Sequence, residues 1–268
     1  MKSHKVYLLF LALLLLLSIG VVIISPFRYS DIVGAPFLKP CHAHILGTDS
    51  IGRDLLVRLG FSVILSIFIA VLSVVFSVGI GSVYGSFAGY KGGKAQALMT
   101  SFIDVIESVP DFLYAILLMV LLNTLLSSRS FGSVLGLLCA IAITSWTQMA
   151  RIVKNSTAAL MRENYILYAQ MKNAGFYHIA AIHLFPNMKE VIISTVLQRI
   201  PSAIFLESFL SFLGIGIQPP LPSLGRLISE GLTSYRTLPI HIFAPSLALA
   251  LVIILFNLAG DAYMRREG

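Results

Sequence analysis

The chain has 268 residues, of which 57% are hydrophobic and only 12% are charged. Soluble globular domains carry about 25% charged residues, so this composition excludes an ordinary soluble protein and indicates an integral membrane protein. The net charge of +7 does not indicate nucleic-acid binding, because the basic residues flank apolar segments and form no single patch.

Six long apolar runs follow one another along the chain. A helix needs about 20 apolar residues to cross a hydrocarbon core of roughly 30 Å. The first run ends in Ser25-Pro26-Phe27-Arg28 without a small-x-small cleavage site, so we interpret it as a retained span and not as a signal peptide. An all-α membrane protein with six transmembrane helices is predicted, with spans at residues 7–25, 62–89, 104–126, 132–150, 191–212 and 242–260.

The lysine and arginine residues predict the orientation of these spans. With the N-terminus inside, eleven of the 19 lie in internal segments and seven in external ones, while Arg199 lies within the fifth run. The positive-inside rule therefore places both termini in the cytoplasm. It places the polar interval at 151–187, the longest between two runs, on the same side.

Three glycines in the second run predict a close helix contact. Gly81, Gly85 and Gly89 recur every four residues and so share one helical face. Small residues at this spacing let a neighbouring backbone approach closely, as is typical of packing between membrane helices. We interpret them as a packing surface and not as a ligand site.

The sequence contains no motif for nucleotide binding or catalysis. Gly93-Lys94-Ala95 has alanine where a phosphate-binding loop needs serine or threonine. The G-x-S-x-G elbow, the H-E-x-x-H pair and zinc-type cysteine/histidine spacings are also missing. We therefore expect neither enzyme activity nor a cofactor bound by this chain. His42 and His44 lack a nearby carboxylate or second thiol at ligand spacing, so we interpret them as solvated polar surface.

Charged residues at membrane depth are candidates for a translocation pathway, because each costs about 3 kcal/mol at the bilayer centre and tends to face a cavity or partner. Asp104, Glu107 and Asp111 have an i, i+3, i+7 spacing, which places them on one face of a single helix. The simpler interpretation is an acidic face at the water interface. Arg199 and Glu207 lie deeper, where structural pairing and a pathway role are both open. The candidate pathway or gate positions are Asp104, Glu107, Asp111 and Glu207.

The segment HILGTDSIGRD at residues 44–54 resembles the H-x-L-G-T-D-x-x-G-R-D signature of bacterial dipeptide, oligopeptide and nickel ABC-transporter permeases of the partner-C type. The resemblance continues to the C-terminus. It implies a type I ABC importer permease fold, with the first helix and an external loop at 1–60 and a core of five helices at 61–268. Further segments in the family's order are Ala88-Gly89-Tyr90, Trp146 with Ala150-Arg151, Glu207 with SFLGIGIQPP at 211–220, and Phe256-Asn257-Leu258 with Gly260-Asp261-Ala262.

The resemblance also assigns a role to the loop at about 151–189. In the family this loop carries E-A-A-x-x-x-G, nine further residues and I-x-L-P, and its short coupling helix inserts into a groove of the ATPase subunit. With the register set on Pro186, the glutamate position falls at Leu167 and the alanine positions at Tyr168 and Ala169. Of the motif residues, only Ala169 and Pro186 match.

The glycine position of the motif falls at Asn173. Asparagine can replace glycine there, because it is the non-glycine residue that most readily adopts a left-handed turn conformation. We predict a cytoplasmic coupling helix around residues 165–173, followed by a turn that ends at Pro186. Residues assigned to ATPase coupling are Arg162, Glu163, Tyr165, Leu167, Tyr168, Ala169, Lys172, Asn173 and Pro186.

The composition of this loop independently suits a docking helix. An apolar and aromatic surface with a basic rim is typical of a helix-in-groove contact. The alternative is an amphipathic helix that merely lies on the membrane surface. The residues expected to form the docking surface are Ile166, Tyr168, Ala169, Met171 and Lys172.

The resemblance implies an inner-membrane importer of peptides, nickel or metal-chelate complexes, and the His42/His44 pair tilts the cargo slightly toward a metal. The implied partners are a second permease subunit in a heterodimer, two ABC ATPase subunits that bind ATP and magnesium, an extracytoplasmic solute-binding protein and membrane lipid, but no nucleic acid. A stand-alone secondary transporter or channel is the main alternative, although matching broken-helix pairs are missing. A non-transporting scaffold would leave the intramembrane charges without a purpose.

Overall fold

The computed structural model describes residues 3–125 and 129–264, and all regular elements in these ranges are helices. Lys2, Arg265 and Arg266, which contribute to the predicted orientation, lie outside the described residues. In chain order the elements are α1 (Ser3–Ile24), α2 (Leu55–Lys91), α3 (Gly93–Glu107), α4 (Asp111–Leu125), α5 (Arg129–Leu160), α6 (Asn164–Met171), α7 (Phe176–Ile179), the π-helical turn η1 (Ala180–Leu184), α8 (Phe185–Phe212), α9 (Leu224–Gly231) and α10 (Ile240–Met264).

Within the described ranges, five helical stretches are long and apolar enough to cross a membrane. They are α1, α2, most of α5, the continuous stretch Phe176–Phe212 and α10. The α3–α4 pair makes a sixth when its two bent halves are taken as one span. The prediction of an all-helical membrane fold with six spans is confirmed in this form.

The third predicted span is not one straight helix. Helix α3 ends at Glu107 and α4 begins at Asp111, and the two are bent by 77°. Pro110 explains the break, because it has no backbone N–H and disfavours a helical conformation at Val109 before it. The prediction that Asp104, Glu107 and Asp111 share one helical face is therefore wrong. Two of them end α3 and the third begins α4.

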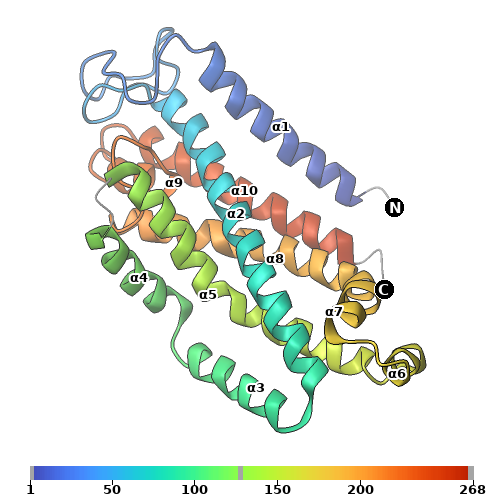
Figure 1. The fold of residues 1–268 in the computed structure, drawn as a ribbon. Helices are drawn as coiled ribbons and strands as arrows, with labels where there is room; N and C mark the ends of the chain where they lie inside the picture. Colours follow the sequence, from blue (N-terminus) through green and yellow to red (C-terminus); the bar gives the residue numbers. More distant parts are fainter. Residues whose placement is uncertain (1–2, 126–128, 265–268) are drawn as a thin grey trace.

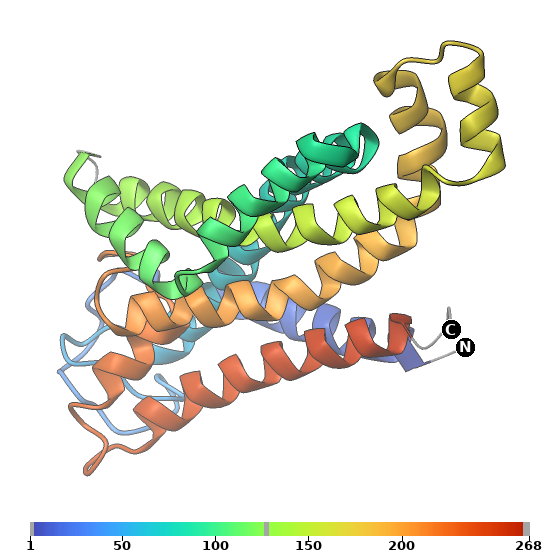
Figure 2. The same cartoon turned by 90° about the horizontal axis from the view of Figure 1, so that it is seen from below.

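The two ends of the helix bundle carry different elements. The loop at 25–54 and helix α9 lie at one end, whereas α6 and α7 lie at the other (Figure 1). A view from below shows that α1 begins, and α10 ends, at the end that carries α6 and α7 (Figure 2). The predicted placement of the polar interval and both terminal helix ends on one side agrees with this arrangement.

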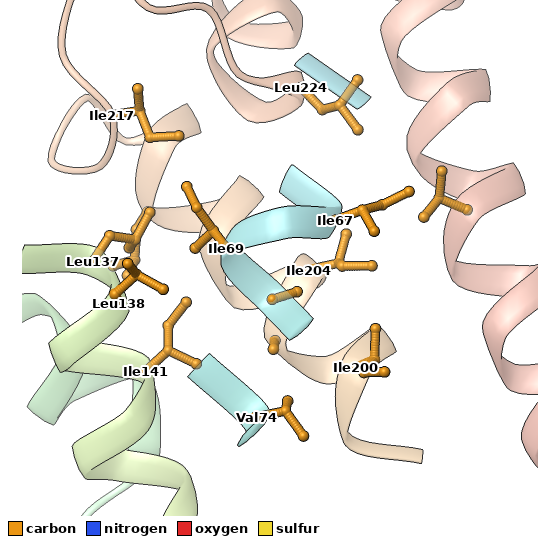
Figure 3. Packing of buried hydrophobic residues seen from close by; sticks show 14 of the residues in the cluster. Ile67, Ile69, Val74, Leu137, Leu138, Ile141, Ile200, Ile204, Ile217 and Leu224 are labelled. Carbon is orange, nitrogen blue, oxygen red and sulfur yellow. The ribbon is translucent and has the colours of Figure 1, made fainter. Parts of the chain in front are cut away.

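The main apolar core lies where α2, α5 and α8 meet. Ile69 of α2, Ile141 of α5 and Ile204 of α8 are fully buried, and Figure 3 shows their side chains gathered in one region. Lipid tails are as apolar as these side chains, so close packing and not exclusion of water stabilises the contact. Ile217 and Leu224 extend this core toward α9.

Helices α2 and α5 touch through the predicted glycine face. A Cβ atom added to Gly81 would lie 2.6 Å from the carbonyl oxygen of Trp146, and one added to Gly89 would lie 2.7 Å from the Cβ of Thr157. Gly85 lies between them on the same side of α2. No side chain fits at such distances, so the prediction of a close backbone contact is confirmed.

We expect Gly85→Ala to destabilise the protein. The added methyl group would meet the carbonyl oxygen of Ala150 and would lie 3.0 Å from the Cβ of Val153. Separating the two helices costs about 1–3 kcal/mol and lowers the melting temperature of the purified protein in detergent. Gly79→Ala is the matched control, because a Cβ added there has nothing within 4 Å. Equal melting of both variants would contradict this interpretation of the α2–α5 contact.

Candidate functional site

Helix α6 is anchored through its one fully buried side chain. Ile166 packs in a second apolar cluster with Ile179, Leu184 and Met188, which come from α7, η1 and α8. The prediction that Ile166 belongs to the docking surface is therefore wrong. Successive residues of a helix point in directions about 100° apart, so Ile166 can face inward while its neighbours Tyr165 and Leu167 face outward. Here Ile166 attaches α6 to the start of α8.

The other side of α6 presents aromatic and apolar side chains to solvent. Tyr165, Leu167 and Tyr168 are exposed, and Met171 is 83% exposed. The Nζ atom of Lys172 lies 4.7 Å from the centre of the Tyr168 ring, within the range of a cation–π interaction. The expected apolar surface with a basic rim is thus present, with Tyr165 and Leu167 contributing where Ile166 does not.

A left-handed turn follows α6. Asn173 has a φ of 59°, which confirms that asparagine takes the conformation expected at the glycine position of the motif. The turn directs the chain into α7, and a groove of about 900 Å³ lies along it. The groove is lined by Asn164, Tyr165, Tyr168, Ala169, Lys172, Asn173, Ala174, Gly175, His178 and His183.

The predicted turn that ends at Pro186 is wrong. Residues 176–212 form one continuous helical stretch, and Pro186 lies in the first turn of α8. Pro186 directly follows the π-helical turn η1, where the α-helical hydrogen-bond pattern is already interrupted, so the N–H that proline lacks is tolerated there. Arg162 and Glu163, also assigned to coupling, are exposed in the short connection between α5 and α6.

The acidic pathway candidates of α3 form ion pairs with α5. Arg151 Nη2 donates hydrogen bonds to Asp104 Oδ1 at 2.7 Å and to Glu107 Oε2 at 2.5 Å. Asp111 has a different environment, because it lines a pocket that also contains Arg199 of α8. Sequence spacing gave no signal for the pairing with Arg151, whose partners are 44 and 47 residues away.

Glu207 is fully buried in α8. Its Oε2 accepts a hydrogen bond from Ser66 of α2 at 2.7 Å, and its Oε1 accepts one from Ser211 at 3.1 Å. Ser208 donates a further hydrogen bond to Oε2 at 3.1 Å. Hydroxyl groups thus satisfy this carboxyl group and connect α2 to α8. In this conformation Glu207 lies away from the surface of the chain.

The opposite end of the bundle holds a buried ionic network that our candidate residues did not include. Asp49 Oδ2 accepts hydrogen bonds from Arg53 Nε at 2.7 Å and from Arg58 Nη1. Arg58 Nη1 also donates to Glu230 Oε2 at 2.7 Å, and the Arg58 side chain is only 1% exposed. Because Glu230 belongs to α9, the network connects the 25–54 loop and the start of α2 to the segment that follows α8.

The surroundings of Asp49 keep it ionised. Burial alone would raise the pKa of its carboxyl group, but hydrogen bonds from the backbone N–H groups of Arg53 and Ile51 and the charge of Arg58 outweigh burial and hold the pKa below 3.8. Its stabilising effect is therefore fully present above pH 3.8 and is lost as the pH falls through the lower pKa of the folded protein.

His44 belongs to the same end of the molecule. Its Nδ1 lies 2.8 Å from Asp54 Oδ2, and Asp54 Oδ1 accepts a hydrogen bond from the N–H of Val57 that caps α2. His42 is exposed, but His44 is buried, so the interpretation of both as solvated surface is wrong for His44. Among the described residues, no three histidine, cysteine or acidic side chains are grouped to hold a metal ion.

Known proteins are similar to this chain in sequence and in fold. Residues 81–266 match the family described as "binding-protein-dependent transport system inner membrane component". The chain is 34% identical over 262 residues to the oligopeptide transport system permease protein OppC of Bacillus subtilis, covering 97% of this chain and 83% of the relative. It is 36% identical over 227 residues to the dipeptide transport system permease protein DppC of the same organism, covering 84% and 68%.

A solved structure shares the fold at low sequence identity. It is described as inward-facing conformations of the MetNI methionine ABC transporter, and the match has a TM-score of 0.58 at 15% identity over 76% of this chain and 94% of that chain. The extent of the family match and the identity to OppC over nearly the whole chain settle the assignment. The chain belongs to the family of binding-protein-dependent transport system inner membrane components, as a multi-pass, non-catalytic permease subunit of an ABC transporter.

Proposed function

We propose that this permease subunit carries short peptides into the cytoplasm, driven by ATPase subunits that dock on α6. The relatives named as oligopeptide and dipeptide permeases support a peptide cargo. The histidine pair no longer favours a metal, because His44 is buried and held by Asp54.

The observation that carries the coupling role is the two-sided geometry of α6. The side of α6 that faces away from the bundle presents Tyr168 and Met171 beside Lys172, which suits insertion into a groove of a partner. Its inward side is attached through Ile166 to Met188 at the start of α8. A displacement of α6 by the ATPase would therefore reach α8 by rigid-body motion, since packed interfaces resist continuous deformation.

The full assembly contains this chain, a second permease subunit, two ATPase subunits that bind ATP and magnesium, and a solute-binding protein. Both termini and α6 face the cytoplasm in this proposal, and the 25–54 loop faces outward. The distribution of lysine and arginine supports this orientation. The ionic network around Asp49 then lies at the side where the solute-binding protein delivers cargo.

Reconstitution into liposomes with and without the ATPase subunits tests the proposed function. We expect uptake of a labelled tripeptide only with all subunits, the binding protein and ATP, because this chain supplies a pathway and no energy source. Excess unlabelled peptide should compete and nickel should not. ATP-independent uptake by the permease subunits alone would favour a secondary transporter or channel instead.

A further inference from the structure

A pocket with both signs of charge lies among α4, α5 and α8. Its volume is about 350 Å³, and it contains Asp111 and Arg199 together with the hydroxyl groups of Ser145 and Ser202. The remaining lining is apolar and aromatic. Its other members are Phe112, Ala203, Phe205, Leu206 and Phe209.

The charges of this pocket are not paired by contacts within the subunit. Within the described ranges, Arg199 makes no hydrogen bond and no ion pair, and it interacts with Asp111 and Glu107 only through space. Asp111 Oδ2 accepts a hydrogen bond from Gln148 at 3.5 Å, the long limit of such a bond. An ionised side chain at membrane depth costs about 3 kcal/mol unless it faces a cavity or a partner. Both charges face the same cavity.

The break at Pro110 brings these two charges into one pocket. Because α3 and α4 are bent by 77°, Asp111 does not share a helical face with Asp104 and Glu107. It lies instead at the start of α4, in the pocket that Arg199 of α8 also lines. The other two acids both form ion pairs with Arg151, whose single positive charge offsets one of their two negative charges. Asp111 is thus the member of the acidic trio that forms no ion pair within the described residues and that shares a pocket with Arg199.

We infer that this pocket is a transit site for a free peptide, in which Arg199 binds the C-terminal carboxylate and Asp111 the N-terminal ammonium group. A guanidinium binds a carboxylate through two parallel hydrogen bonds, and a carboxylate accepts the hydrogen bonds of an ammonium group. The aromatic lining suits apolar peptide side chains and supplies no specific recognition. This inference rests on the proposed function and adds which chemical groups of the cargo the permease itself contacts.

The test is a comparison of two cargoes in two transporters. The complete wild-type and Arg199→Gln transporters are reconstituted with the same binding protein, and each takes up a free tripeptide or its C-terminal amide at saturating binding protein. We expect Arg199→Gln to lower uptake of the free peptide about tenfold relative to the amide, the size of a lost charge-assisted contact. Any preference of the binding protein is the same in both transporters and cancels in the ratio.

Two further variants complete the design. Gln198→Ala is the matched control, because the neighbouring Gln198 donates to Met264 Sδ at 3.0 Å, on the α10 side of α8. It should leave the ratio unchanged. Arg199→Lys keeps the charge but not the two parallel hydrogen bonds, so we expect normal assembly and an intermediate ratio.

Equal losses for the free and amidated peptides would overturn the transit site. Failure of both Arg199 variants to assemble with the second permease subunit would also overturn it, because Arg199 would then be a structural partner of that subunit. Absence of ATP-dependent uptake by the wild-type transporter is a separate result that would reject the proposed function itself.

Discussion

We expect Tyr168→Asp to abolish coupling between the permease and its ATPase subunits. Tyr168 is 59% exposed, on the side of α6 that faces away from the bundle. A buried aromatic anchor contributes about 2–4 kcal/mol to an interface, and the new carboxylate would be desolvated without a partner when the helix docks. Binding-protein-stimulated ATP hydrolysis should therefore fall by at least about tenfold. Membrane insertion should be normal, because Tyr168 lies outside the predicted spans.

The control for this variant is Tyr235→Asp. Tyr235 is also exposed, but it follows α9 at the opposite end of the bundle. The ATPase subunits should copurify with the Tyr235→Asp transporter and be depleted from the Tyr168→Asp transporter. Normal ATP hydrolysis and full peptide uptake by Tyr168→Asp would remove α6 from the coupling mechanism.

Features that depend on local sequence were predictable. Apolar runs located the spans, because a helix must satisfy its own backbone groups in lipid. The four-residue glycine spacing predicted a close helix contact, which the structure forms with α5. The conformational freedom of asparagine predicted the left-handed turn at Asn173. The prediction of one straight helix for the third span was wrong for a local reason that is visible in the sequence. Pro110 was counted as part of an apolar run although it cannot continue the preceding helix.

Features that depend on distant contacts were not predictable from one sequence. Glu230 is 172 residues from Arg58, and Ser66 is 141 residues from Glu207, so spacing carries no signal for either pair. Ile166 was assigned to the wrong side of α6, because an eight-residue helix has too few turns for apolar periodicity to identify its buried side. The signature segment did contain Asp49 and Arg53, but the resemblance alone did not say that they form an ion pair.

Arg58→Met should destabilise the end of the bundle that carries the 25–54 loop more than any other single substitution in the network. Removing one partner from a buried ion pair costs about 3–5 kcal/mol, because the remaining charge stays buried without compensation. Here two carboxylates, those of Asp49 and Glu230, would lose the guanidinium that joins them. Arg53 and Arg226 would still contact them, so the fold should survive with a lower melting temperature in detergent.

Two further variants separate a network effect from a general loss of positive charge. Arg28→Met removes a positive charge from the same loop, but Arg28 is exposed, so we expect a change within about 0.5 kcal/mol. Arg58→Lys keeps a cation beside Asp49 and Glu230 and should lose less stability than Arg58→Met, although lysine cannot present the planar fork of arginine. If Arg58→Met melts at the same temperature as Arg28→Met, the network does not hold α9 to the loop. If it melts far below, the ion pairs of Arg58 with Asp49 and Glu230 hold α9 to the loop.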